Sequence, residues 1–272
     1  MTVDDAQLPA LLDAVGALAG RAGEAILATV RSPGEFEEKA DGSPVTRADR
    51  AAHEILVEGL SRLDPGHTVV SEEGDVEGTV RVAGSVYWLV DPLDGTKEFI
   101  AGRPEYTVNV ALVEKGVPIL GVIQVPVNGR LYLGARGHGA RLVDGEGEAP
   151  LTPASVDRPL TAVVSRSHLN ARTEEFLGQL GITETTPCGS SLKICAVAEG
   201  VADVYPRFGP TCLWDTAAGA AIATAAGCSV VDLEGQPLRY DPANGIKHAG
   251  FLVAAPGGCL DACLPALRAA SS

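Results

Sequence analysis

The chain has 272 residues, of which 46% are hydrophobic, enough to bury the core of one large domain or two small ones. The formal net charge of −14 excludes the basic surface that a nucleic acid polymer would need. It does not exclude a small phosphorylated substrate, because metal ions can supply the positive charge. We therefore expect a small-molecule partner rather than a nucleic acid.

Cysteine spacing and hydropathy indicate the cellular compartment in which the protein is expected to work. The six cysteines include no Cys-x-x-Cys pair, and no histidine lies at zinc spacing from them. The N-terminus is acidic and amphipathic, unlike a secretory signal, and no apolar run reaches the roughly 18 residues that span a bilayer. These features predict reduced thiols in a cytoplasmic protein. The sequence leaves open a homodimer and peripheral binding to the inner membrane face.

Two amphipathic helices are predicted at the start of the chain. Apolar residues recur at three- and four-residue steps over residues 8–30, and the pattern ends at Ser32-Pro33-Gly34. Thr46 is typical of the N-cap of a second helix, with Asp49 in its first turn. The residues alone favour a capping role for Asp49. The functional alternative is a carboxylate that orients or deprotonates a metal-bound water.

A short strand is predicted next, at residues 68–70, and it leads into the acidic pair Glu72 and Glu73. Acidic pairs are usually solvated, so the residues alone assign Glu72 no role. The polar, glycine-containing segment 74–85 predicts a loop.

The most informative stretch begins with the apolar run 86–90, which predicts a buried strand that stops before the proline after Asp91. Asp91 and Asp94 then lie three residues apart on a turn eased by Gly95, and Thr96 can open a helix. Two carboxylates at roughly 4 Å repel by about 4 kcal/mol at an effective dielectric near 20. Such a pair needs a shared proton or a cation, and its oxygen ligands suit Mg²⁺. A solvated turn that caps a helix is the structural alternative.

The remaining pattern changes near residue 150. Strand signals at 106–112, 117–125 and 131–133, the last after Asn128-Gly129, make residues 1–150 an α+β subdomain with helices on a largely antiparallel sheet. This subdomain would carry most of the candidate metal ligands. Residues 151–272 predict an α/β subdomain, because strands (161–164, 183–186, 202–205, 251–254) alternate with helices (173–180, 192–199, 216–226, 260–267).

The stretch Asp91-Pro92-Leu93-Asp94-Gly95-Thr96 resembles the D-P-[IL]-D-G-[ST] signature of the lithium-sensitive, magnesium-dependent phosphatases, the superfamily of inositol monophosphatase. Trp214-Asp215, before an alanine-rich helix, resembles the W-D-x-x-[AG] motif of that superfamily, with an N-cap as the structural alternative. The resemblance implies a layered αβαβα sandwich. It implies two or three Mg²⁺ ions bound by Glu72, Asp91, Asp94, Asp215 and the backbone carbonyl of Leu93. It also implies Asp49, Glu72 and Thr96 as catalytic residues, with Asp49 as the base.

Three further stretches, 165–168, 189–193 and 205–210, resemble the 3′(2′),5′-bisphosphate nucleotidases of the bacterial CysQ type. This resemblance implies a substrate site that comprises Gly95, Thr96, His168, Ser190, Lys193, Arg207 and Asp215. It implies that His168, Ser190, Lys193 and Arg207 hold the nucleotide and its 5′-phosphate. The stretch 189–193 starts a predicted helix, with Ser190 and Ser191 both in capping positions. The structural alternatives are a satisfied loop histidine at 168 and a solvated helix lysine at 193.

The predicted reaction is hydrolysis of adenosine 3′,5′-bisphosphate to AMP and phosphate, a step of sulfur metabolism. One alternative is an inositol phosphatase, or another phosphatase of sugar phosphates or nucleotide-like intermediates, on the same scaffold. A Mg²⁺-binding scaffold protein without turnover is the alternative of another class. The presence of every motif carboxylate counts against it.

Overall fold

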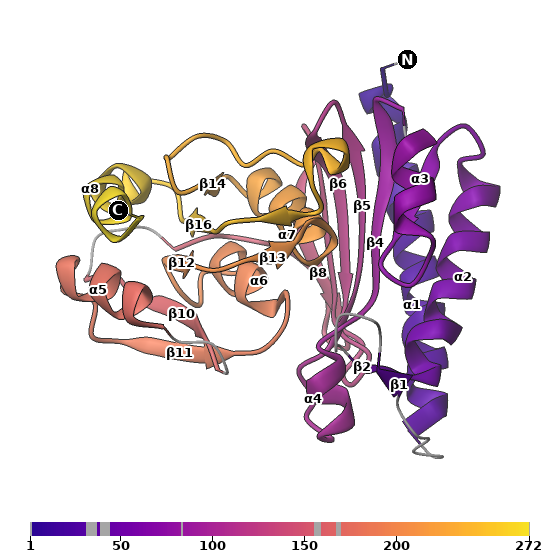
Figure 1. Ribbon diagram of the computed structural model, residues 1–272, viewed down its shortest axis with the longest axis horizontal. Coiled ribbons are helices and arrows are strands. Elements are labelled where there is room, and N and C mark those ends of the chain that lie inside the picture. Colours follow the sequence, from indigo (N-terminus) through magenta and orange to yellow (C-terminus); the bar gives the residue numbers. More distant parts are fainter. Residues whose placement is uncertain are drawn as a thin grey trace.

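The protein is seen here as a computed structural model that describes residues 2–30, 37–38, 44–82, 84–154, 159–166 and 170–271. Figure 1 shows its elements stacked in layers that alternate between helices and sheets. In order, the layers are α1 (Leu8–Val30) with α2 (Arg47–Leu63), a seven-stranded sheet, α6 (Leu192–Ala198) with α7 (Leu213–Ala225), a five-stranded sheet, and α5 (Ala171–Gln179) with α8 (Cys259–Ser271). The predicted αβαβα sandwich is confirmed.

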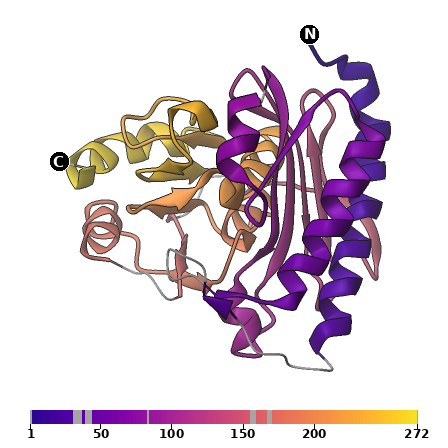
Figure 2. The ribbon, with the colours of Figure 1, turned by 45° about the vertical axis from the view of Figure 1, so that its right-hand side comes forward.

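The larger sheet lies beside the N-terminal helices. Its strand order is β3-β4-β5-β6-β7-β8-β9, and only the pair of β3 (Thr68–Ser71) and β4 (Val86–Asp94) is parallel. The other strands are β5 (Thr107–Glu114), β6 (Val117–Gln124), β7 (Leu131–Ala135), β8 (Gly139–Asp144) and β9 (Gly147–Pro150). Figure 2 shows α1 and α2 side by side on the outer face of this sheet. Their apolar stripes form one buried cluster with alternate residues of β4 and β5, as their periodicity predicts.

The inner face of the larger sheet is covered by α7. A Cβ at Gly121 of β6 would lie 2.2 Å from the carbonyl oxygen of Ala218, and one at Gly134 of β7 would lie 2.7 Å from Cα of Ile222. Glycine at these positions lets the helix backbone approach the strands directly. This close packing fixes the first turn of α7, which carries Asp215, relative to β4.

The smaller sheet has the strand order β11-β10-β12-β16-β14. In it, β10 (Ala162–Ser165) is parallel to β11 (Thr185–Cys188) and β12 (Val204–Arg207), whereas β16 (Phe251–Ala254) is antiparallel to β12 and to β14 (Ser229–Val231). The predicted alternation of strands and helices is confirmed here. The short elements are η1 (Asp5–Gln7), β1 (Glu37–Glu38), β2 (Pro44–Val45), α4 (Thr96–Ile100), β13 (Thr211–Cys212), η2 (Pro242–Asn244) and β15 (Lys247–His248).

Two predictions for the first half were wrong. Segment 74–85 is not all loop, because α3 (Val76–Val82) forms within it, and the carboxylate of Asp75 accepts a hydrogen bond from the N–H of Gly78 in its first turn. Strand β4 does not stop at Asp91 but continues to Asp94 through Pro92. Its pairing with β5 shifts register between Asp91 and Asp94, so the ladder needs no N–H from the proline.

Three sequence predictions concern the whole chain. No disulfide joins any of the six cysteines, all of which lie in the described ranges. No helix within these ranges combines the length and apolar character needed to cross a bilayer. The boundary between subdomains near residue 150 stays a prediction.

Candidate active site

The end of β4 positions the central motif. Asp91 is only 2% exposed, and its Oδ1 accepts a hydrogen bond of 3.0 Å from the N–H of Leu93, which folds the chain back at the register shift. Gly95 has a φ of +95°, in the left-handed region, and a Cβ there would lie 2.9 Å from the carbonyl oxygen of Glu105. Glycine is therefore required at this turn, which delivers Thr96 to the start of α4.

Three carboxylates from distant parts of the chain gather next to this turn. Glu72 follows β3, Asp91 lies near the end of β4, and Asp215 lies in the first turn of α7. Each offers one oxygen atom, and these oxygens lie within 4.8 Å of one another. We call these three residues the acidic cluster.

The acidic cluster favours protons or a cation. Burial, followed by the charges of Glu72 and Asp94, raises the pKa of Asp91 well above its ordinary value. Burial, followed by the charges of Asp94 and Glu72, raises the pKa of Asp215 to about 7. Carboxylate oxygens in such an arrangement are the donors that hard divalent cations prefer, so the cluster fits a magnesium ion.

The prediction that Asp215 precedes its helix was wrong in detail. Helix α7 begins at Leu213, so Asp215 is its third residue and Cys212 is the N-cap. Oδ2 of Asp215 accepts hydrogen bonds from the N–H of Cys212 at 3.0 Å and from the hydroxyl of Thr211 at 2.9 Å. Asp215 thus caps the helix from within its first turn and faces the acidic cluster at the same time.

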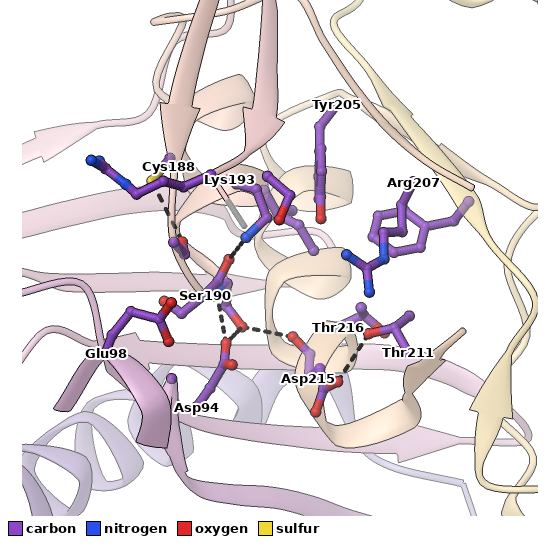
Figure 3. A pocket seen from close by; sticks show the side chains of 17 residues that line it. Asp94, Glu98, Cys188, Ser190, Lys193, Tyr205, Arg207, Thr211, Asp215 and Thr216 are labelled. Carbon is purple, nitrogen blue, oxygen red and sulfur yellow. Dashed lines mark hydrogen bonds between the residues drawn. The ribbon is translucent and has the colours of Figure 1, made fainter. Parts of the chain in front are cut away.

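Asp94, which Figure 3 shows lining the cavity, is held by Ser191. Its Oδ2 accepts two hydrogen bonds of 2.6 Å from Ser191, one from the backbone N–H and one from the hydroxyl. Asp94 is not one of the three residues of the acidic cluster. Its charge nevertheless contributes to the raised pKa values of Asp91 and Asp215. The backbone carbonyl of Leu93 accepts a hydrogen bond of 3.1 Å from the hydroxyl of Thr96. Metal ligation by Asp94 and Leu93 stays a prediction.

Asp49 combines the two interpretations of its role. Its Oδ2 accepts a hydrogen bond of 2.7 Å from the N–H of Thr46, which completes the predicted capping box of α2. Its Oδ1 lies 3.2 Å from the hydroxyl of Thr96, which shares its one proton between this oxygen and the carbonyl of Leu93. Asp49 is only 1% exposed, and its charge contributes to the raised pKa of Asp91. Capping is confirmed, and its catalytic role stays a prediction.

A cavity of about 160 Å³ opens beside these residues. Figure 3 shows Asp94 and Asp215 at one end of it and Lys193 and Arg207 at the other. Gly95, Ser190 and Tyr205 also line it. The cavity therefore presents acidic groups at one end and basic groups at the other. The two ends could bind a metal-associated group and a separate anion, respectively.

Lys193 is not a solvated helix lysine. It is only 6% exposed, its Nζ lies 5.5 Å from the ring centre of Tyr205, and it donates a hydrogen bond to the carbonyl of Ser190. Burial lowers the pKa of its ammonium group. Ser190 has a φ of +40°, an unusual conformation for a residue with a side chain, which directs its carbonyl to this lysine.

Arg207 is fixed at the end of β12. Its guanidinium donates a hydrogen bond of 3.2 Å to the carbonyl of Pro210, while its buried Nε has no partner among the described residues. His168, the remaining predicted substrate residue, lies outside the described residues.

The cavity has further lining residues to which the sequence assigned no metal or substrate role, among them Arg166, Ser191, Tyr205 and Thr211. The guanidinium of Arg166 forms an ion pair of 2.7 Å with the carboxylate of Glu105. Ser191 lies in the stretch 189–193, where the sequence predicts only a capping role for it. Its contact with Asp94 spans 97 residues and leaves no local signal.

Residues 9–268 match the inositol monophosphatase family. The 3′(2′),5′-bisphosphate nucleotidase CysQ of Escherichia coli K12 is 48% identical over 245 residues, which cover 89% of this chain and 99% of that protein. The crystal structure of CysQ from Bacteroides thetaiotaomicron is 43% identical with a TM-score of 0.78, and the match covers 89% of this chain and 97% of that one. Inositol monophosphatase from Anabaena, at 24% identity and a TM-score of 0.77 over 97% of both chains, shares the fold. The chain therefore belongs to the inositol monophosphatase family.

Proposed function

We propose that this protein is a Mg²⁺-dependent phosphomonoesterase that hydrolyses adenosine 3′,5′-bisphosphate to AMP and inorganic phosphate. The observation that carries the proposal is the cavity with the carboxylates of Asp94 and Asp215 at one end and the cations of Lys193 and Arg207 at the other. The similarity to CysQ nucleotidases over 89% of the chain supports the same substrate class.

The two ends of the cavity match the two phosphates of such a substrate. The scissile 3′-phosphate is a dianion and would lie at the acidic end only with cations between it and the carboxylates. The 5′-phosphate keeps its charge throughout and would lie against Lys193 and Arg207. Burial favours this role for Lys193, because an anion beside it would restore the charge stabilisation that water no longer provides.

Two or three Mg²⁺ ions would be held by Glu72, Asp91, Asp94, Asp215 and the carbonyl of Leu93. When bound, they would supply Lewis-acid stabilisation of the phosphate oxygens and a water of lowered pKa. The chain's own contribution is to position the water and to accept its proton. Asp49 and Thr96, which contact each other at 3.2 Å, would do this. Attack forms a bond between the water oxygen and phosphorus and breaks the bond from phosphorus to O3′ of the ribose. The proton removed from the water passes to Asp49, and O3′ takes a proton from solvent and leaves as the ribose hydroxyl.

The test is phosphate release in the presence of Mg²⁺ from adenosine 3′,5′-bisphosphate, myo-inositol 1-phosphate and fructose 1,6-bisphosphate. We expect the nucleotide to have the highest kcat/KM. A higher kcat/KM for a sugar phosphate would overturn the substrate assignment but would remain consistent with the proposed metal site. Release from none of them, at any Mg²⁺ concentration, would contradict the proposed activity.

A further inference from the structure

Ser191 lies at the N-cap position of α6, but its hydroxyl does not cap that helix. The N-cap geometry is helical, with φ of −66° and ψ of −9°, and the side chain makes no hydrogen bond to the first turn. The usual reason for a serine at this position is therefore absent. The side chain is only 4% exposed, so its hydroxyl is directed into the protein.

The hydroxyl of Ser191 instead connects three other elements. Its Oγ lies 2.6 Å from Oδ2 of Asp94, 2.6 Å from the backbone carbonyl of Asp215, and 2.8 Å from Nδ2 of Asn109. The amide of Asn109 donates, so the single hydroxyl proton is shared between the carboxylate and the carbonyl. Figure 3 marks hydrogen bonds at Asp94 and at Asp215 with dashed lines.

Asn109 donates a hydrogen bond to the hydroxyl of Ser191 and so helps to orient it. It is fully buried in β5, directly opposite Asp91 in β4. Its Oδ1 is buried and has no partner within the described ranges, so its amide group is anchored through the bond to Ser191. The network therefore links the strand pair that carries Asp91 and Asp94 to the helices on the other side of the cavity.

We infer that Ser191 is a positioning residue that holds Asp94 and the first turn of α7 in register for metal binding. The inference rests on the proposed function, because it assumes that Mg²⁺ binds at these carboxylates. It assigns to the hydroxyl a role in metal affinity rather than in contact with substrate. Asp94 comes from β4 and Asp215 from α7, and the hydroxyl contacts both residues. Such supporting hydrogen bonds fix the orientation of ligating carboxylates.

The experiment compares Mg²⁺ binding to the wild type and to Ser191→Ala by calorimetry, without substrate. The substitution removes one oxygen atom and keeps the backbone N–H bond to Asp94, so the fold is retained. We expect the affinity for Mg²⁺ to fall roughly tenfold or more. Ser191→Thr, which keeps a hydroxyl, should recover most of the affinity. Thr173→Val, which removes another buried hydroxyl bonded to Asn170, should bind Mg²⁺ as the wild type does.

Activity gives a second readout. In Ser191→Ala the Mg²⁺ concentration for half-maximal phosphate release should rise by about the same factor, while KM for the nucleotide at saturating Mg²⁺ should change less than about twofold. Equal Mg²⁺ affinity of the wild type and Ser191→Ala would overturn the inference. A rise in KM without a change in Mg²⁺ affinity would also overturn it, since it would place the hydroxyl on the substrate. Failure of the wild type to bind Mg²⁺ would instead contradict the proposed function.

Discussion

The hydroxyl of Thr96 donates a hydrogen bond of 3.2 Å to Oδ1 of Asp49, whose other oxygen caps α2. One carboxylate thus joins the first turn of a long helix to the turn after β4. The cap fixes the side chain, and the free lone pairs of Oδ1 remain available to a water. This arrangement suits a general base, because its position does not depend on the substrate.

We expect Asp49→Asn to reduce kcat by about 10²–10⁴-fold, the usual contribution of a positioned base, while KM changes little. Some stability should also be lost with the capping box, about 1 kcal/mol. Phosphate release and urea denaturation measure the two effects separately. Asp4→Ala, which removes the cap of η1 far from the cavity, is the control and should keep full kcat. A kcat of the asparagine variant within threefold of the wild type would remove Asp49 from the catalytic step.

Asp91 should destabilise the folded protein when no metal is bound. It is buried, and the nearby charges of Glu72 and Asp94 raise its pKa. Asp91→Asn replaces a carboxyl whose ionised form is destabilised in the folded protein, so we expect the Tm of the protein in excess EDTA to rise. The same change should abolish phosphate release and weaken Mg²⁺ binding, because asparagine is a poorer ligand for a hard cation. Glu24→Gln, at an exposed position of α1, should alter neither quantity. A lowered Tm in EDTA would contradict the repulsion argument.

The secondary structure was largely predictable because its signals are local. The apolar periodicity of α1 and α2, the alternation in β5 and the turn residues between strands are each read from neighbouring residues. The predictions that were wrong have tertiary causes. Pro92 stays within β4 because the partner strand shifts register there, and α3 forms where Val76 and Val80 pack against the core.

The site was predictable in its residue types and less so in its contacts. The motif around Asp91 and Asp94 predicted an acidic turn from spacing and repulsion alone. The burial of Lys193 against Tyr205 and the bond between Ser191 and Asp94 depend on how α6 packs across the cavity. No pattern in the sequence near these residues reports that packing, so the sequence predicted a solvated lysine and a capping serine as alternatives.

The pH dependence of stability should differ between the metal-free and metal-bound protein. Asp215 has a pKa of about 7 in the folded protein against an ordinary value of 3.8. A raised pKa means that the folded state binds the proton more tightly, so the unfolding free energy falls as pH rises from about 4 to about 7 and then levels off. The shift corresponds to at most about 4 kcal/mol. With saturating Mg²⁺ the sign reverses, because the metal binds the ionised form.

Denaturation between about pH 5 and about pH 8, in EDTA and in Mg²⁺, measures this dependence. Asp215→Asn is the matched variant, since it cannot titrate at this position. In EDTA the wild type should lose stability relative to the variant over this range. Parallel curves for the two proteins would show that Asp215 titrates normally.

Lys193 and Arg207 should distinguish a bisphosphate from a monophosphate. Lys193 lies over Tyr205, and Arg207 is held by the carbonyl of Pro210, so both cations are fixed at one end of the cavity. Lys193→Met keeps the apolar stem and removes the charge. We expect KM for adenosine 3′,5′-bisphosphate to rise about 10–100-fold, the usual effect of losing a charged hydrogen bond. KM for adenosine 3′-monophosphate should rise less than about threefold, because it has no 5′-phosphate.

Arg207→Ala should show the same selectivity. The control is Lys115→Met, an exposed lysine at the turn between β5 and β6, at the other end of β4 from the acidic cluster. It should leave both KM values unchanged. Because Lys193 is buried with a lowered pKa, its replacement by methionine should not reduce the Tm, so a change in KM cannot be attributed to unfolding. Equal increases in KM for the two substrates would show that Lys193 and Arg207 do not bind the 5′-phosphate. The assignment of the metal site would not be affected.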